Sequence, residues 1–133
     1  MLARTIRYRL ALGLSRMRVA YYRCLGVDIG KKCFISSGAH VDVAGGRVSI
    51  GSHVNIASGS YILAHTHGQM QELPETILED GVIVFVNAVV LPGVRVGRNS
   101  IVGAGCVVVR DVPPDAVLMG NPARVVEYRS QRT

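Results

Sequence analysis

The chain has 133 residues and a mass of 14.3 kDa, which is enough for one domain with a continuous core and too little for two independent domains. Apolar residues make up 49% of the sequence, but there is no tryptophan and there are only two phenylalanines, which excludes a core built on large aromatic anchors. The net charge of +6 is concentrated in residues 1–32, which hold eight basic residues and one acid. This basic segment is therefore the part of the chain that could contact anionic lipid, nucleic acid or an acidic partner.

The three cysteines, Cys24, Cys33 and Cys106, form no CxxC motif and leave one thiol unpaired in any intramolecular scheme. This argues against a disulfide framework and favours a reducing cytoplasm. The basic N-terminal segment contains an apolar run of only five residues, "LALGL", before Ser15. It therefore predicts neither a secretory signal nor a membrane-spanning helix.

Residues 1–26 are predicted to form a basic amphipathic helical segment. Large apolar residues recur there at steps of three and four, at Leu2, Ile6, Leu10, Leu14, Met17, Tyr21 and Leu25. Gly13 weakens the middle, so two short helices remain an alternative to one long helix. The apolar stripe is expected to cap the end of the domain or to cover a hydrophobic seam.

From residue 27 onward the sequence follows a period of six. Branched aliphatic residues lead the hexads at Ile29, Ile35, Val41, Ile50, Ile56, Ile62, Leu78, Val84, Val90, Val96, Val102 and Val108. Three extra residues separate Val41 from Ile50, and a longer interruption follows Ile62. A short extended segment followed by a tight turn explains the period, and stacking the turns buries one aliphatic column. We expect this repeat over residues 27–112, with one projecting loop at 63–77 and a C-terminal tail or cap at 113–133.

The hexads, the block "VGRNSIVGAGCVVVRDVPPDAVLMGNPARVV" and the loop sequence "AHTHG" resemble the hexapeptide-repeat acyltransferases, which include maltose, galactoside and Nod-factor acetyltransferases. The resemblance covers roughly residues 27–128. It implies an all-β fold, a left-handed parallel β-helix of hexapeptide repeats, here with an N-terminal amphipathic helix and one projecting loop. It also implies a homotrimer, acetyl-CoA as co-substrate in the groove between neighbours, and a loop histidine as general base, without a metal.

The same resemblance suggests individual site residues. A gapless match to the "TATHP" loop of sugar acetyltransferases puts His67 at the position of the base, whereas a shorter loop would put His65 there. Ala104 matches a small residue beside the pantetheine arm of CoA, and Arg110 and Arg124 match basic residues near its nucleotide and phosphates. The alternative interpretation is a turn alanine and two surface arginines.

Several positions depart from the family pattern. Ile83 and Phe85 stand where an aromatic residue and a glycine are common, and Glu79 replaces a glycine. Ser37 occupies the position nearest to an asparagine that helps to bind the acceptor in the sugar acetyltransferases. The identity of the acceptor is therefore open.

Together these features predict transfer of an acetyl group from acetyl-CoA to a hydroxyl or amine of a sugar or saccharide precursor, as in polysaccharide biosynthesis. The enzyme is expected in the cytoplasm, with peripheral membrane contact through residues 1–25 and without nucleic-acid binding. One alternative is a non-catalytic β-helical scaffold. Another is a metal site like that of γ-carbonic anhydrases, although His65 and His67 are only two residues apart and His40 and His53 belong to separate hexads.

Overall fold

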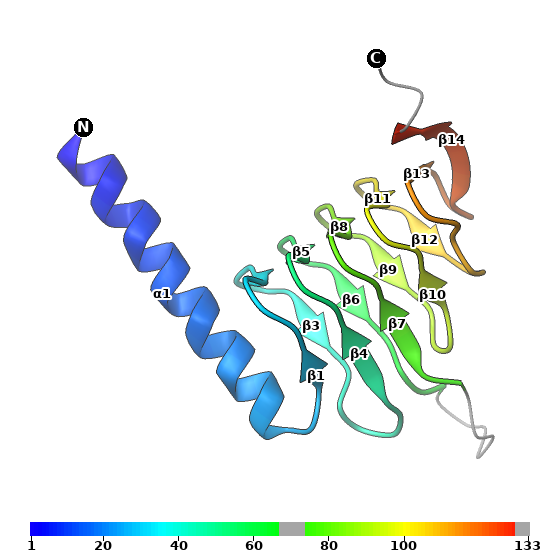
Figure 1. Ribbon diagram of the computed structural model, residues 1–133, viewed down its shortest axis with the longest axis horizontal. Coiled ribbons are helices and arrows are strands. Elements are labelled where there is room, and N and C mark those ends of the chain that lie inside the picture. The colour runs from blue at the N-terminus through cyan, green and yellow to red at the C-terminus, as the bar shows by residue number, and fades with distance from the viewer. Residues whose placement is uncertain (67–73, 130–133) are drawn as a thin grey trace.

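The computed structural model describes residues 1–66 and 74–129, and consists of one long helix against the end of a three-sided column of short strands (Figure 1). The helix α1 spans Leu2–Cys24. The strands are β1 (Asp28–Ile29), β2 (Phe34–Ile35), β3 (His40–Val41), β4 (Val48–Ile50), β5 (Asn55–Ile56), β6 (Tyr61–Ile62), β7 (Thr76–Leu78), β8 (Ile83–Val84), β9 (Val89–Val90), β10 (Arg95–Val96), β11 (Ile101–Val102), β12 (Val107–Val108), β13 (Ala116–Met119) and β14 (Arg124–Tyr128). The strands are short because the chain turns a corner after each hexad.

The strands form three sheets, one on each side of the column, in which every strand pair is parallel except β13 with β14. Sheet A has the order β1-β4-β7-β10, sheet C has the order β12-β9-β6-β3, and sheet B runs from β2 through β5, β8 and β11 to β13 and β14. Each hexad aliphatic pairs with the one a full turn later, as Ile50 does with Ile29 and with Leu78. We call the corner from sheet A to B the first corner, from B to C the second, and from C back to A the third.

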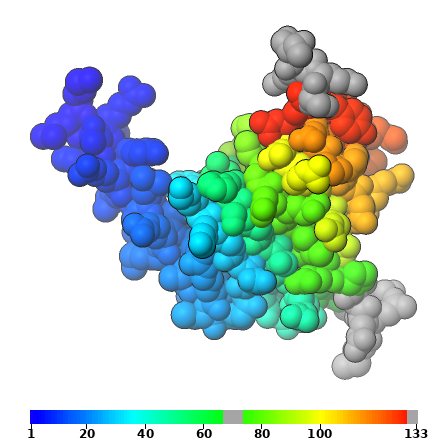
Figure 2. Space-filling model, viewed as in Figure 1, coloured from blue at the N-terminus to red at the C-terminus, as the bar shows by residue number. Residues whose placement is uncertain are grey.

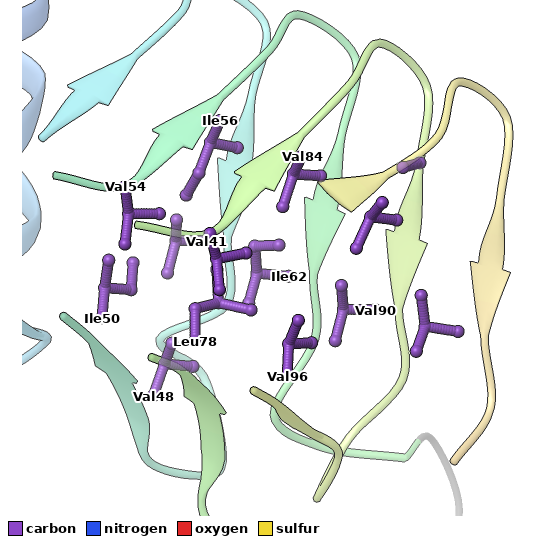
Figure 3. Packing of buried hydrophobic residues seen from close by; sticks show 14 of the residues in the cluster. Val41, Val48, Ile50, Val54, Ile56, Ile62, Leu78, Val84, Val90 and Val96 are labelled. Atoms are coloured by element: carbon purple, nitrogen blue, oxygen red, sulfur yellow. The ribbon is translucent and has the colours of Figure 1, made fainter. Parts of the chain in front are cut away.

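The aliphatic residues that lead the hexads fill the inside of the column (Figure 3). All twelve are buried, none more than 7% exposed. Burying one such side chain contributes about 1.5–3 kcal/mol, so the column supplies most of the apolar stabilisation. The predicted repeat is therefore confirmed.

The predicted N-terminal helix is also confirmed, as one continuous helix that passes through Gly13. It covers the open edge of the first coil by hydrogen bonds to its strands. Ser15 Oγ accepts a hydrogen bond of 2.9 Å from the Ile35 amide of β2, and the Arg18 guanidinium donates to the Ile35 carbonyl at 3.1 Å. An edge strand left uncovered presents unpaired backbone groups on which other chains can pair.

The edges of β1 and β3 are satisfied in the same way. Arg23 donates to the carbonyls of Ile29 and Gly30, and the Tyr22 hydroxyl accepts from the Val41 amide at 3.3 Å. The helix thus caps all three sheets through these polar groups and the buried Val19, and not through its apolar stripe. The expectation that the stripe itself would cover the domain end is wrong, because the backbone groups of a sheet edge need hydrogen-bonding partners.

The C-terminal segment adds two strands to sheet B. Strand β13 runs parallel to β11, and β14 turns back antiparallel to β13. The described part of the predicted tail is therefore an ordered extension of the sheet up to residue 129. Cys24, Cys33 and Cys106 are free thiols. Among the described residues no helix is both long enough and apolar enough to cross a bilayer.

Candidate active site

The third corner brings Asp42 and His65 together. Asp42 directly follows β3 and His65 lies three residues after β6, and these strands are neighbours in sheet C, with Val41 opposite Ile62. The amide of Asp42 donates to the carbonyl of Ile62 at 2.8 Å, which fixes the two segments against each other. Residues far apart in the sequence thus meet on adjacent coils.

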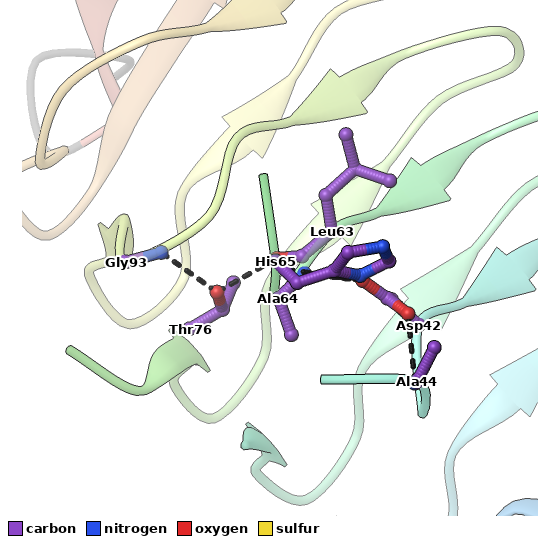
Figure 4. Close-up of polar contacts among 7 residues, drawn as sticks. All are labelled: Asp42, Ala44, Leu63, Ala64, His65, Thr76 and Gly93. Atoms are coloured by element: carbon purple, nitrogen blue, oxygen red, sulfur yellow. Dashed lines mark hydrogen bonds and ion pairs between the residues drawn. The ribbon is translucent and has the colours of Figure 1, made fainter. Parts of the chain in front are cut away.

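The Asp42 carboxylate is held by hydrogen bonds from the backbone and from the histidine ring (Figure 4). Oδ1 accepts from the Ala44 amide at 3.0 Å, and Oδ2 accepts from the amides of Ala64 at 3.0 Å and His65 at 3.1 Å. Oδ2 also contacts Nδ1 of His65. Burial alone raises the pKa of Asp42, but the bonds from Ala44, Ala64 and His65 together outweigh it and hold this pKa below its ordinary value.

The pair orients the imidazole. An ionised carboxylate can only accept hydrogen bonds, so its contact with Nδ1 places the ring proton on Nδ1 and the basic lone pair on Nε2. The side chain of Asp42 is 4% exposed and that of His65 is 29% exposed. The carboxylate is therefore shielded, whereas the imidazole is partly exposed.

Two glycines in the short insertion between Val41 and Ile50 allow this close approach. A Cβ at Gly45 would lie 3.1 Å from Cβ of His65. A Cβ at Gly46 would overlap the carbonyl oxygen of Ala64 and lie 2.9 Å from its carbonyl carbon. The insertion therefore packs closely against Ala64 and His65, and only glycine leaves room for this contact.

Thr76 closes the neck of the loop. Its hydroxyl donates to the Leu63 carbonyl at 2.8 Å, on the side where the loop begins, and accepts from the Gly93 amide at 2.9 Å (Figure 4). Thr76 is fully buried and is the first residue of β7. The two ends of the loop are therefore anchored to the same side chain, and through Gly93 to the next coil.

His67, the other predicted base, lies outside the described residues. Asp42 was missed by the sequence analysis, although two signals could have identified it. It directly follows the hexad aliphatic Val41, and it opens the insertion that breaks the period. An acidic residue at the start of a corner insertion is a candidate partner for a histidine on the next coil.

Arg110 lies on the same corner as His65. Strand β12 pairs with β9, and β9 with β6, in register, so Arg110 stands two coils from Ala64. With strands about 4.8 Å apart, this separation is roughly 10 Å along the edge. Ala104 lies instead on the second corner, across sheet C, and Arg124 begins β14 at the end of sheet B. All three side chains are exposed. Of the three, only Arg110 lies on the same corner of the column as His65 within one chain.

The departures from the family pattern are on the outside of the column. Phe85 is 45% exposed, directly after β8, and Glu79 forms an ion pair of 3.2 Å with Arg95. His40 is exposed on β3, where its ring lies tilted against that of Tyr61, and His53 occupies the first corner. No group of three or more His, Cys, Asp or Glu side chains in residues 1–66 and 74–129 is arranged to hold a metal ion.

Comparison with known proteins agrees with this architecture. The family model described as bacterial transferase hexapeptide (six repeats) matches residues 75–110. A 2,3,4,5-tetrahydropyridine-2,6-dicarboxylate N-acetyltransferase of Staphylococcus aureus is 51% identical over 55 residues, which are 41% of this chain and 23% of that enzyme. The chain thus matches less than a quarter of that curated relative.

The fold is shared with solved acetyltransferases. A hexapeptide-repeat acetyltransferase from Vibrio cholerae superposes with a TM-score of 0.70 at 30% identity, over 77% of this chain and 62% of that one. A structure of this Vibrio cholerae protein with acetyl-coenzyme A gives a TM-score of 0.62 at 25% identity, over 90% and 83% of the two chains. A polySia-specific acetyltransferase gives 0.70 at 27% identity, over 77% and 52%.

The three parallel sheets, the buried hexads and these matches define a left-handed parallel β-helix, as the resemblance implied. The hexapeptide family model matches residues 75–110 of this chain, and the solved structures that the chain resembles are acetyltransferases.

Proposed function

We propose that this protein transfers an acetyl group from acetyl-CoA to a hydroxyl or amine of a saccharide, with a histidine at the third corner as general base. The observation that carries the proposal is the Asp42–His65 pair at the neck of the loop. Its buried carboxylate sets the proton on one ring nitrogen and leaves the other as the base, which is the arrangement that general-base catalysis requires.

The reaction needs no group beyond the two substrates and the base. Nε2 takes the proton of the acceptor hydroxyl as its oxygen attacks the thioester carbonyl. The tetrahedral intermediate collapses, the C–S bond breaks, and the proton passes from the imidazolium to the departing CoA thiolate. The base is neutral again after each turnover, and alignment of the two substrates supplies the rest of the acceleration.

Acetyl-CoA as donor is supported by the Vibrio cholerae neighbour, whose structure holds it. Arg110 is suited to the phosphates of CoA because it is exposed on the same edge as His65. Ala104 and Arg124 lie elsewhere on the surface of the chain, so their predicted contacts with the donor require an adjacent copy. This supports the homotrimer, in which a groove forms between neighbours.

A saccharide acceptor is supported by the polySia-specific and maltose acetyltransferases among the structural neighbours. Ser37 stands at the position nearest to the acceptor-binding asparagine of the sugar acetyltransferases, so the particular saccharide is left to the assay. A role in polysaccharide biosynthesis agrees with this substrate class, and the three free cysteines favour a cytoplasmic location.

The proposal is tested by free-thiol release from acetyl-CoA over a panel of sugars and sugar nucleotides. We expect His65→Ala to lower kcat by about 10²–10⁴-fold with acetyl-CoA binding retained. Loss in His67→Ala alone would move the base two residues further along the loop and leave His65 a supporting role. If both variants keep the wild-type activity, the histidine mechanism is wrong.

Asp42 is a positioning residue, so its variant needs a matched control. Asp42→Asn should lower kcat while KM for acetyl-CoA stays the same. Asp80→Asn is the control, since Asp80 also accepts a backbone hydrogen bond from a neighbouring coil, at 2.8 Å from the Ser52 amide, but at the first corner. Acetyl-CoA binding without turnover on any acceptor would favour the non-catalytic scaffold instead.

A further inference from the structure

The apolar stripe of α1 faces away from the β-helix. Side chains that contact the coils, among them Ser15, Val19 and Tyr22, lie on one side of the helix. At about 100° per residue, the stripe lies on the opposite side. Its members Leu2, Ile6, Leu10, Leu14, Met17 and Tyr21 are between 43% and 76% exposed. The stripe is therefore an apolar surface that the described fold does not cover.

The helix stands clear of the column along much of its length. In Figure 2 its N-terminal half, in dark blue, extends away from the coils. The edge-capping bonds come from Ser15, Arg18, Tyr22 and Arg23, all in its second half. The stripe runs for about 29 Å from Leu2 to Tyr21 at 1.5 Å per residue. A surface of this length, accessible from the side, can lie flat on a partner.

Arginines border the stripe on both sides. By the helical spacing, Arg9 and Arg16 follow one border and Arg7 the other. The helix contains six arginines and no acidic residue. An apolar stripe with cations on both borders is typical of helices that lie in the headgroup region of a membrane.

A cavity lined by basic side chains lies next to one border of the stripe. It has a volume of about 560 Å³, lies between α1 and the first coil, and is lined in part by Arg16, Arg23, Lys31 and Lys32. Arg16 belongs to both the cavity and the border. Positive charge thus gathers beside the apolar surface, where the phosphates of anionic lipids would lie.

We propose that α1 docks this protein on a bilayer containing anionic lipid, with the stripe in the acyl boundary and the arginines and lysines at the phosphates. A second copy of α1 fits the same surface poorly, because it would bring six more arginines against these six. A lipid surface supplies both an apolar layer and negative charge. The docking goes beyond the proposed acetyl transfer and is measured without it.

The test is co-sedimentation of the full chain with vesicles of phosphatidylcholine alone or mixed with phosphatidylglycerol. Binding should require phosphatidylglycerol and weaken as salt is added. The combined change Ile6→Gln, Leu10→Gln and Met17→Gln should weaken binding at least about tenfold. Val126→Gln with Met119→Gln is the matched control, since both residues are exposed on β14 and β13 at the other end, and it should bind as wild type.

A charge variant separates the two contributions. Arg7→Gln with Arg9→Gln and Arg16→Gln should also weaken binding at least about tenfold, since each arginine near the surface contributes. Arg98→Gln, on an exposed turn of the β-helix, is its control. Equal binding to both kinds of vesicle, or binding that the stripe and charge variants retain, would overturn the proposal.

A third variant reports the docked face directly. The chain has no tryptophan, so Leu10→Trp gives one emission signal, which should shift to shorter wavelength with phosphatidylglycerol vesicles, whereas Val126→Trp should not shift. The competing occupant of the stripe is a second copy of this chain, and light scattering in solution tests for it by measuring the particle mass. If the stripe variant lowers the particle mass and the tryptophan signal ignores lipid, the stripe is an interface between copies and lipid docking is wrong.

Discussion

The first two corners of the β-helix differ sharply from the third. In each of the four coils, the residue three places after the hexad aliphatic has a positive φ at the first and second corners, between 56° and 77°. These residues are Lys32, His53, Gly81 and Asn99 at the first corner and Gly38, Gly59, Asn87 and Gly105 at the second. Among the described residues of the third corner, only Gly93 keeps this conformation.

The departure of the third corner coincides with the candidate site. Both interruptions of the hexad period fall there, after β3 and after β6, and so do Asp42, His65 and Arg110. The first and second corners, which only connect strands, repeat the same left-handed turn. The third corner carries the insertions, and it also carries the side chains of the candidate site. Four experiments test this contrast, in order of decreasing effect.

Gly46→Ala should do the most damage. The added methyl group would overlap the Ala64 carbonyl oxygen, so backbone must move, and we expect a loss of about 2–3 kcal/mol in unfolding free energy together with loss of turnover. Gly105→Ala is the counterpart at a regular corner. It meets open space but has φ +70°, so it should cost about 1–2 kcal/mol and spare turnover. Urea unfolding and the thiol assay measure both, and equal losses of turnover would contradict the contrast.

Thr76→Val should cost about 2 kcal/mol, because the Leu63 carbonyl and the Gly93 amide each lose a buried partner. Ser60→Ala removes a similar buried hydroxyl, which donates to the Phe85 carbonyl at 2.7 Å at the second corner, and should cost roughly 1 kcal/mol. Only Thr76→Val should lower kcat, since it releases the loop. A matching fall in kcat for Ser60→Ala would show that the effect comes from general stability.

Arg110→Gln should raise KM for acetyl-CoA about fivefold and leave the unfolding free energy unchanged, since an exposed contact to phosphate is worth about 1 kcal/mol. Arg98→Gln is the control, because Arg98 holds the same place in its hexad as Arg110 but lies on the first corner. Steady-state kinetics distinguish them. An equal rise for Arg98→Gln would place the donor elsewhere.

The smallest effect concerns pH. The pKa of Asp42 is lower in the folded chain than in the unfolded one, where it is near ~3.9, so its stabilisation is complete above the unfolded pKa and is lost as pH falls through the folded pKa. Asp42→Asn should therefore flatten the decline of unfolding free energy below about pH 4, with little change in slope at neutral pH. Urea titrations over this pH range measure it, and an unchanged acid limb would contradict the assignment.

Most of the fold could be predicted because it depends on a local rule repeated many times. One aliphatic per hexad and a turn residue at each regular corner specify a coil, and the stacking of coils follows from burial. The site could be predicted only in part. The motif named His67 and His65 as candidate bases, but it did not name Asp42, because a single carboxylate has no period and meets His65 only through the register of β3 and β6.

The helix shows the same division. By itself the sequence predicted that residues 1–26 form a basic amphipathic helical segment with an apolar stripe, since helical spacing is a local property. Only the tertiary structure decided which face packs on the coils. The open edges of three sheets present backbone amides and carbonyls, and Ser15, Arg18, Tyr22 and Arg23 satisfy them where the stripe could not, so the stripe faces outward.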